Sequence, residues 1–273
     1  MTSVTPKNPS QSEHEGFVIA IVFLTFVALL MAWLRFTPEG FWEKLSAVGY
    51  SVCHQMTTRT FHVEGHAFPL CARCTGMFLG AMVGLAYHLS WGRKGSFPPL
   101  PIMYVLAFFL AAFGIDSINS FTQLLPWANH LYETTNITRI ISGAGMGVMI
   151  SAIIGPLFNQ TAWADVVPEP AMSNFKKLIN VLVVLAVLLL GIVGEYVPVM
   201  YFAAVAGGLS VFLLISVLYT ILAILLLRRD GKLMHNRELV LPALIGMCFA
   251  LVQISFMTLI RYSLTHSWLP INL

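Results

Sequence analysis

The feature that most constrains this chain is a series of apolar stretches, each close to the length that spans a membrane. There are seven, covering about residues 17–35, 72–92, 100–119, 137–158, 177–196, 200–227 and 239–262. A helix needs roughly 20 mostly apolar residues to cross the hydrocarbon core of a bilayer. The sequence therefore predicts an all-α fold, a polytopic transmembrane helical bundle of about seven transmembrane helices.

The composition agrees with a membrane protein. Of the 273 residues, 58% are hydrophobic and only 10% are charged, and the mean hydropathy is +0.80. A soluble globular domain carries about 25% charged residues. No basic run is long enough to indicate nucleic-acid binding, so we expect membrane lipids and no nucleic acid as partners.

The apolar stretches divide the chain into four parts. Residues 1–16 form a polar cytoplasmic tail, and residues 17–39 an uncleaved first transmembrane helix with a linker. Residues 40–158 form a core that begins with an interfacial helix at 40–52 and continues with three transmembrane helices. Residues 159–273 add three more helices, two of them joined in a tight hairpin at Val197-Pro198.

Lysine and arginine are distributed unequally between the two ends of these helices. Nine lie at one end: Lys7, Arg93, Lys94, Lys176, Lys177, Arg228, Arg229, Lys232 and Arg237. Six lie at the other: Arg35, Lys44, Arg59, Arg73, Arg139 and Arg261. Because cytoplasmic loops carry the excess of positive charge, the amino terminus is predicted to be cytoplasmic. The cysteine-containing loop at 53–71 then faces the extracytoplasmic side.

Small residues recur every four positions in two of the predicted helices. The first series is Gly76, Gly80 and Gly84, followed by His88, and the second is Gly143, Gly147, Ser151 and Gly155. Such spacing lets two helix backbones approach closely inside a membrane. We expect these helices to touch, which would bring Arg139 near Cys74. The alternative is that the glycines only reflect the composition of membrane helices.

Three of the four cysteines lie close together in the sequence, as Cys53, Cys71 and Cys74. Two cysteines at positions i and i+3 share one face of a helical turn, and zinc binds cysteine sulfur and histidine nitrogen in tetrahedral geometry. The spacing predicts a metal site, with zinc or another transition metal held by the three cysteines. His54 is the first choice for the fourth ligand, ahead of the histidines at 62 and 66.

Other uses of the cysteines stay open. An oxidising compartment would favour a disulfide, and Cys71 with Cys74 would then be a redox pair. Buried thiols with no reactive role are a further alternative. Covalent haem attachment is excluded because it requires a histidine where Thr75 stands. Cys248 lies in the middle of an apolar stretch and is interpreted as a packing residue.

Polar residues at the ends of two predicted helices would face the same side of the membrane. Asp116 and Asn119 share one helix face, and Asn136 and Arg139 share another. In one interpretation Asp116 pairs with Arg73 or Arg139 and locks the helices together. In the other, Arg59, Arg73 and Arg139 bind an anion, because guanidinium groups suit phosphate and carboxylate.

Several of these residues carry a family resemblance. The motifs are Cys53-His54-Gln55, Arg59, Phe61, Pro69-x-Cys71-Ala72-Arg73-Cys74-Thr75-Gly76 and Gly80, then Asp116 and Arg139-x-x-Ser142-Gly143-x-x-x-Gly147. Over about residues 40–158 they resemble an uncharacterised prokaryotic membrane family, domain of unknown function 2085. Thr60 departs mildly from it, since many members have serine there. The resemblance implies that the motif residues form one unit in a multi-pass protein of the prokaryotic cytoplasmic membrane, and it brings no settled activity.

The leading functional hypothesis is a metal site that supports an enzyme acting on a phosphate-containing lipid. Asp116 and His54 would be the catalytic residues. The anion would be bound by Arg59, Arg73, Asn119, Asn136 and Arg139. The alternatives are a non-catalytic, metal-stabilised membrane protein or transporter, and a thiol-disulfide redox protein. A lipid-sized groove between the helices at 72–92, 100–119 and 137–158 would favour the lipid hypothesis.

Overall fold

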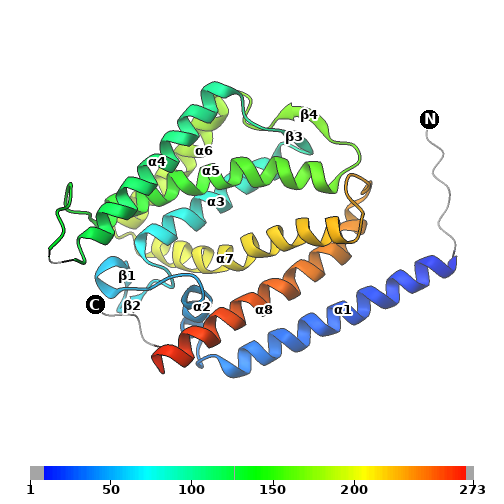
Figure 1. The fold of residues 1–273 in the computed structure, drawn as a ribbon, viewed down its shortest axis with the longest axis horizontal. Coiled ribbons are helices and arrows are strands. Elements are labelled where there is room, and N and C mark those ends of the chain that lie inside the picture. Colours follow the sequence, from blue (N-terminus) through cyan, green and yellow to red (C-terminus); the bar gives the residue numbers. More distant parts are fainter. Residues whose placement is uncertain (1–8, 126, 269–273) are drawn as a thin grey trace.

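The computed structural model describes residues 9–125 and 127–268, and it is an all-α bundle as predicted (Figure 1). Its long helices are α1 Pro9–Phe36, α3 Ala72–Ser90, α4 Leu100–Thr122, α5 Asn136–Ala162, α6 Phe175–Val193, α7 Val197–Leu226 and α8 Val240–Thr265. The short helices are α2 Phe41–Tyr50, η1 Thr57–Arg59 and η2 Asn236–Leu239. The first eight residues of the predicted tail lie outside the described residues, as do Pro126 and residues 269–273.

Six of these helices are long and apolar enough to cross a membrane, among the residues described. The exception is α3, which was predicted as a seventh span. Its polar residues, including Arg73, Thr75 and His88, lower its hydropathy. Because α5 and α7 cover much of its surface, α3 still belongs to the centre of the bundle.

Two helix boundaries were predicted well and one was not. The helix predicted at 40–52 is α2, whose interfacial position stays a prediction, and the predicted hairpin is formed by α6 and α7, joined by the short link Gly194–Tyr196. However, α1 begins at Pro9, so the second half of the predicted polar tail is helical. Polar residues before Phe17 extend the helix beyond its apolar part.

The predicted contact between the two glycine-bearing helices is confirmed. A Cβ added to Gly76 would overlap the carbonyl oxygen of Ile140 on α5, and one added to Gly147 would overlap the carbonyl oxygen of Met77 on α3. Here α3 and α5 pack with their backbones in direct contact, as small residues at this spacing allow. This contact fixes the first turn of α3 beside the start of α5.

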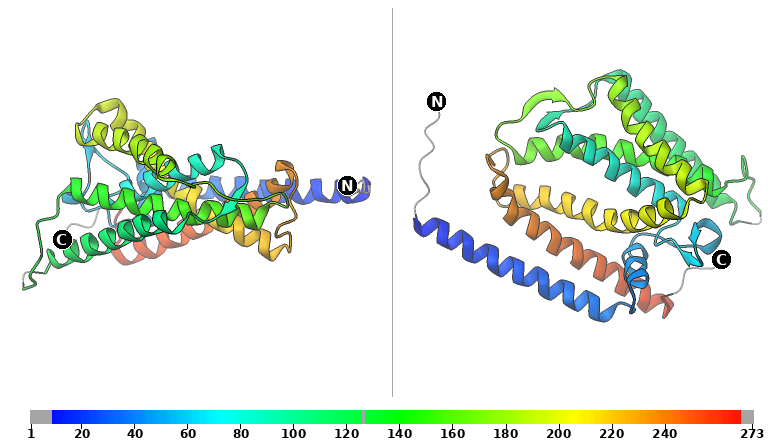
Figure 2. Two further views of the ribbon diagram at one scale, coloured as in Figure 1. Left: turned by 90° about the horizontal axis from the view of Figure 1, so that it is seen from above. Right: turned by 180° about the vertical axis from the view of Figure 1, so that it is seen from behind.

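The helices lie side by side in a fixed order across the bundle. Helix α1 runs along α8 at one edge, α7 follows, then α3 with α5, and α4 with α6 at the other edge (Figures 1 and 2). At one end of the bundle, β1 His62–Val63 and β2 His66–Ala67 form an antiparallel hairpin. At the other end, β3 Lys94–Ser96 pairs in parallel with β4 Val167–Pro170.

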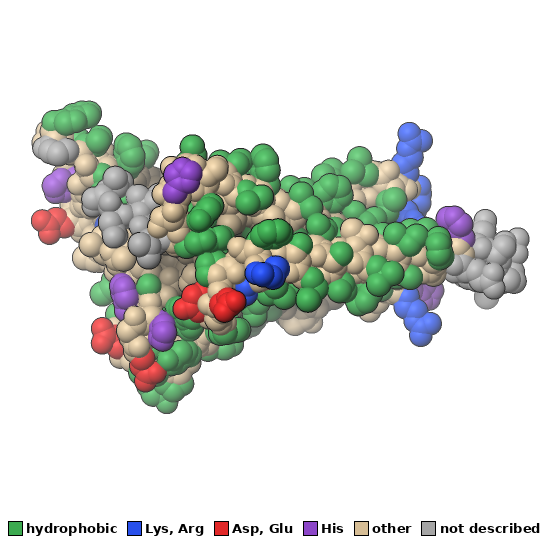
Figure 3. Space-filling model, turned by 90° about the horizontal axis from the view of Figure 1, so that it is seen from below, with side chains coloured by type: hydrophobic (Ala, Val, Ile, Leu, Met, Phe, Trp, Pro, Cys, Tyr) green, Lys and Arg blue, Asp and Glu red, His purple; other side chains and the backbone are tan. Residues whose placement is uncertain are grey.

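The surface charge differs between these two ends. On the face drawn in Figure 3, acidic side chains gather toward the end with β1 and β2, with basic side chains beside some of them, and further lysine and arginine side chains stand near the start of α1, whereas histidines are seen toward both ends. Hydrophobic side chains cover much of the surface between them. This pattern is expected of helices whose sides face lipid. Which end is cytoplasmic stays a prediction.

Candidate functional site

The three clustered cysteines meet at one end of the bundle. Cys53 lies in the loop after α2, Cys71 is the N-cap of α3, and Cys74 lies in the first turn of that helix. Their three Sγ atoms lie within 4.8 Å of one another. Cys53 and Cys71 are buried and Cys74 is partly buried. The structure thus brings together all three sulfur ligands predicted from the sequence.

The surroundings of these sulfurs favour a thiolate at Cys71, whereas the pKa values of Cys53 and Cys74 are raised. The Sγ atom of Cys53 accepts the backbone N–H groups of Gln55 at 3.4 Å and of Cys71 at 3.2 Å. Cys71 also stands at a helix amino terminus, where the helix dipole favours a thiolate. Hydrogen bonds from Cys53 and Cys74 lower the pKa of Cys71 well below its usual value, although burial opposes them. The pKa of Cys53 is raised to about 12, chiefly by its hydrogen bond with Cys71.

His54 lies beside the cysteines without joining them. Its Nδ1 atom accepts the backbone N–H of Met56 at 3.0 Å. A neutral imidazole that accepts through Nδ1 carries its proton on Nε2 and donates from there. His54 also hydrogen-bonds to Cys71 and helps to lower the pKa of that thiol. The group of three sulfurs close enough to share an ion does not include His54.

Two residues without a predicted role hold the cysteine loop in place. The side-chain amide of buried Gln55 donates to the carbonyl oxygens of Ser46 at 2.9 Å and Pro69 at 2.8 Å. From α8, the guanidinium of Arg261 donates to the carbonyl oxygens of Tyr50, Cys53 and His54. Gln55 has a signal in the sequence, because it belongs to the family motif. For Arg261, the sequence shows only that it lies near the end of an apolar stretch, which does not indicate a contact with the cysteine loop.

Asp116 and Arg73 form the ion pair that one interpretation predicted. The Nε and Nη2 atoms of Arg73 donate to Asp116 Oδ2 at 3.1 and 2.5 Å, and only 4% of the Asp116 side chain is exposed. Tyr132 donates to Asp116 Oδ1 at 2.9 Å and Ser142 to Oδ2 at 3.0 Å. One carboxylate thereby joins α3, α4, α5 and the loop before α5.

The other two arginines of the predicted anion site are buried and have neutral partners. Arg59 donates to Ser120 Oγ at 3.1 Å and to the Ser120 carbonyl oxygen at 3.0 Å. Arg139 donates to Ser120 Oγ at 3.3 Å, to Asn136 Oδ1 at 3.1 Å and to Thr134 Oγ1 at 2.6 Å. Among the described residues, no carboxylate forms a salt bridge with either guanidinium. Of the three guanidinium groups, only that of Arg73 pairs with a carboxylate in the described part of the chain, that of Asp116.

The two predicted asparagines hold this region by hydrogen bonds within the chain. The Asn119 side chain donates to the carbonyl oxygen of Tyr132 at 2.8 Å and accepts the backbone N–H of Leu131 at 2.6 Å. Asn136 accepts from Arg139, as given above. His62 and His66 belong to the β1–β2 hairpin and are not part of the sulfur group.

The sulfur group and the arginine group are electrostatic neighbours. The charge on Cys71 acts on both Arg59 and Arg139, and Arg73 acts on both of them as well. Burial, and next the charge of Arg73, lower the pKa of Arg59. A negative centre at the cysteines thus lies next to an excess of positive charge.

The fold and these two groups define a polytopic helical membrane protein with a three-cysteine centre at one end of its bundle. Residues 53–153 match the family described as predicted membrane protein (DUF2085), and the chain belongs to this family. It is similar to an uncharacterized protein of Methanocaldococcus jannaschii, with 31% identity over 150 residues, covering 52% of this chain and 90% of that protein. An uncharacterized protein of Methanothermobacter thermautotrophicus is 34% identical over 104 residues, covering 36% of this chain and 82% of that protein. No solved structure matches the chain.

Proposed function

We propose that this membrane protein binds one zinc ion through Cys53, Cys71 and Cys74. The observation that carries the proposal is the meeting of three Sγ atoms within 4.8 Å, with two of the cysteines buried. Thiolates are preferred ligands of zinc, and a helix amino terminus beside them favours the deprotonated form. Gln55 and Arg261 further support the proposed zinc site, since they fix the loop that carries Cys53.

The arginine group supports a role in binding an anion beside the metal. Arg59, Arg73 and Arg139 carry three positive charges, and among the described residues only the Asp116 carboxylate forms a salt bridge with any of them. A buried charge without a counterion is costly, so an anion that pairs with these guanidinium groups is favoured. Guanidinium binds phosphate oxygens in bidentate fashion. We therefore propose a phosphate group as the anion.

Three protein ligands are also the number typical of catalytic zinc sites. Zinc with three protein ligands keeps one position open and acts there as a Lewis acid toward a phosphoryl oxygen. His54 and Asp116 are the residues nearby that could handle protons, although Asp116 is already engaged with Arg73, Tyr132 and Ser142. We propose that the protein is an enzyme acting on a phosphate-containing lipid. The alternative is a metal-stabilised non-catalytic protein or transporter.

Elemental analysis of the purified protein tests the metal site. We expect about one zinc ion per chain in the wild type, as in other single-ion sites. Cys71→Ser should lose it. Cys248→Ser is the matched control, because the Cys248 thiol lies in α8, with its Sγ atom 3.8 Å from the carbonyl oxygen of Val22, and should keep the ion. A wild type without stoichiometric metal, or equal metal in Cys71→Ser, contradicts the proposal.

Thiol titration on the same samples addresses the redox alternative. With zinc bound, all four cysteines should be reduced, and the three site thiols should react only after a chelator is added. A disulfide among Cys53, Cys71 and Cys74 that appears without added oxidant would favour redox chemistry instead.

A further inference from the structure

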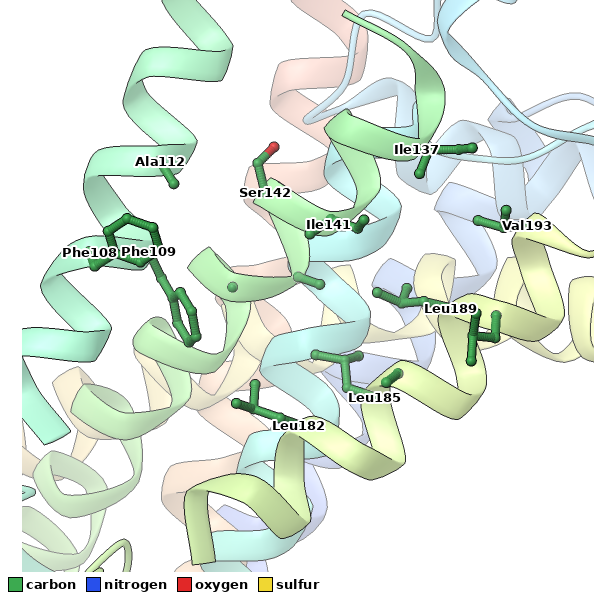
Figure 4. Close-up of a pocket in the computed structure, with 14 residues that line it drawn as sticks. Phe108, Phe109, Ala112, Ile137, Ile141, Ser142, Leu182, Leu185, Leu189 and Val193 are labelled. Carbon is green, nitrogen blue, oxygen red and sulfur yellow. The ribbon is translucent and has the colours of Figure 1, made fainter. Parts of the chain in front are cut away.

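An apolar groove of about 450 Å³ opens on the side of the bundle between α4, α5 and α6 (Figure 4). Phe108 on α4, Ile141 on α5 and Leu189 on α6 stand along its walls. The groove is open to the lipid, since Phe108 is 67% and Ile141 58% exposed. Its volume lies within the roughly 300–1,000 Å³ of ligand pockets. This groove is bounded by α6, whereas the groove that would favour the lipid hypothesis was expected between α3, α4 and α5.

Among the described residues that line the groove, only Ser142 has a polar side chain, and it connects the groove to the charged groups. Figure 4 shows it at the edge of the groove, with its hydroxyl turned away from Leu182 and Leu185. This hydroxyl donates to Asp116 Oδ2 at 3.0 Å, on the carboxylate that binds Arg73. The apolar groove therefore ends at the ion pair.

Helix α4 continues from the groove into the arginine group. Phe108, Ala112, Asp116 and Ser120 follow one another every four residues, a row that turns around the helix by about 40° per step, from an exposed Phe108 to a buried Ser120. The first two line the groove, the third binds Arg73, and the fourth accepts from Arg59 and Arg139. With a rise of 1.5 Å per residue, Asp116 lies about 6 Å and Ser120 about 12 Å beyond Ala112 along the axis.

We propose that this groove holds a hydrocarbon chain of a membrane lipid whose phosphate headgroup binds at Arg59, Arg73 and Arg139. The headgroup part rests on the proposed function, and the chain part rests on the groove. The charge excess beside the groove selects an anionic headgroup over a neutral one.

Two alanine-to-phenylalanine changes on adjacent residues of α4 test the chain site. Ala112 lines the groove, whereas Ala111 is exposed outside it. Ala112→Phe should fill the groove, and Ala111→Phe is the matched control for added bulk on the same helix. Ala186→Phe, on the α6 wall, fills the groove from the opposite side and guards against a folding defect specific to Ala112→Phe.

Native mass spectrometry in detergent measures the binding of three probes. These are phosphatidic acid, diacylglycerol with the same acyl chains, and inorganic phosphate. For the wild type and Ala111→Phe, phosphatidic acid should bind about tenfold tighter than either of the other two, as expected when chain and headgroup both contribute. Both groove-filling variants should lose about tenfold in affinity for phosphatidic acid, while their affinity for inorganic phosphate stays unchanged.

The remaining outcomes overturn the inference. Equal binding of diacylglycerol and phosphatidic acid would mean that only ordinary surrounding lipid fills the groove. Equal binding of phosphatidic acid by Ala112→Phe, Ala186→Phe and Ala111→Phe would mean that the groove takes no part, so the anion is a free phosphate. Zinc content is measured on the same samples, so a failure of the metal site is seen separately from a failure of the groove.

Discussion

Arg261 donates a hydrogen bond from Nη1 to the carbonyl oxygen of Cys53, although the two residues are 208 positions apart. The same guanidinium donates to the carbonyl oxygens of Tyr50 at 2.9 Å and His54 at 3.2 Å, and lies 3.7 Å from the centre of the Tyr50 ring. Helix α8 thus holds the loop that presents the first cysteine. Arg261 lies outside the segment 53–153 that matches the family, so this chain supports the family motif with a helix beyond it.

The first prediction concerns this support. Arg261→Gln should lower zinc affinity about 10- to 100-fold, the range typical of residues that orient metal ligands. Glutamine keeps a donor but cannot reach three carbonyl oxygens and stack on Tyr50. Competition with a chromogenic chelator measures the affinity.

The control for this change is Arg237→Gln, at an exposed position at the opposite end of the bundle. It should leave zinc affinity unchanged. If both variants bind zinc as tightly as the wild type, Arg261 has no positioning role, and the cysteine loop is held well enough by Gln55 alone.

The parts of the site that the sequence predicted are those with a local spacing. Cys71 and Cys74 are three positions apart and share a helix turn, and the glycine series around Gly76 and Gly147 placed α5 against α3. These patterns act over one or two helix turns, so they can be read without knowing the fold. Together they indicated that Arg139 and Asp116 lie near the cysteines, and the structure places all of them at one end of the bundle.

The parts that the sequence did not predict depend on distant pairings. A single arginine near the end of an apolar stretch, such as Arg261, is as typical of a residue at the membrane surface as of one that holds a distant loop. The groove depends on how far α6 stands from α4, which no spacing within either helix determines. For Asp116, the locking interpretation left the partner open between Arg73 and Arg139, and the pair with Arg73 follows from side-chain geometry.

The second prediction concerns the contact between α3 and α5. Gly147→Ala should destabilise the protein by about 1–3 kcal/mol, the usual cost of extra atoms in a packed site. The added Cβ would overlap the carbonyl oxygen of Met77, so the two helix backbones would have to separate. Thermal unfolding in detergent measures the change.

Gly114→Ala is the matched control, because a Cβ added to Gly114 on α4 meets no atom within 4 Å. This variant should be neutral or slightly stabilised, since alanine favours a helix by up to about 1 kcal/mol over glycine. Equal destabilisation of both variants would mean that helix separation is not the cause.

The third prediction concerns the single carboxylate among the three arginines. Asp116→Asn should cost about 3–5 kcal/mol of stability, as expected when one partner of a buried ion pair is removed. The exposed pair of Arg93 with Asp165 provides the control, since 55% of the Asp165 side chain is accessible. Asp165→Asn should change the unfolding temperature little, because exposed ion pairs contribute little. An unchanged unfolding temperature in Asp116→Asn would mean that a bound anion or water already balances Arg73.

The last prediction concerns the protons that zinc displaces. In the zinc-free protein Cys53, with its pKa raised to about 12, is protonated at neutral pH, whereas the lowered pKa of Cys71 favours its thiolate. Zinc binds thiolates, so it must displace at least the proton of Cys53. The affinity for zinc should therefore fall as the pH is lowered, by about tenfold per pH unit for each proton released. Calorimetric titrations in two buffers of different ionisation enthalpy count these protons, with Cys248→Ser as the control that should match the wild type. If zinc binding releases no proton at neutral pH, then Cys53 is not a ligand, and the three-sulfur centre is contradicted at its first residue.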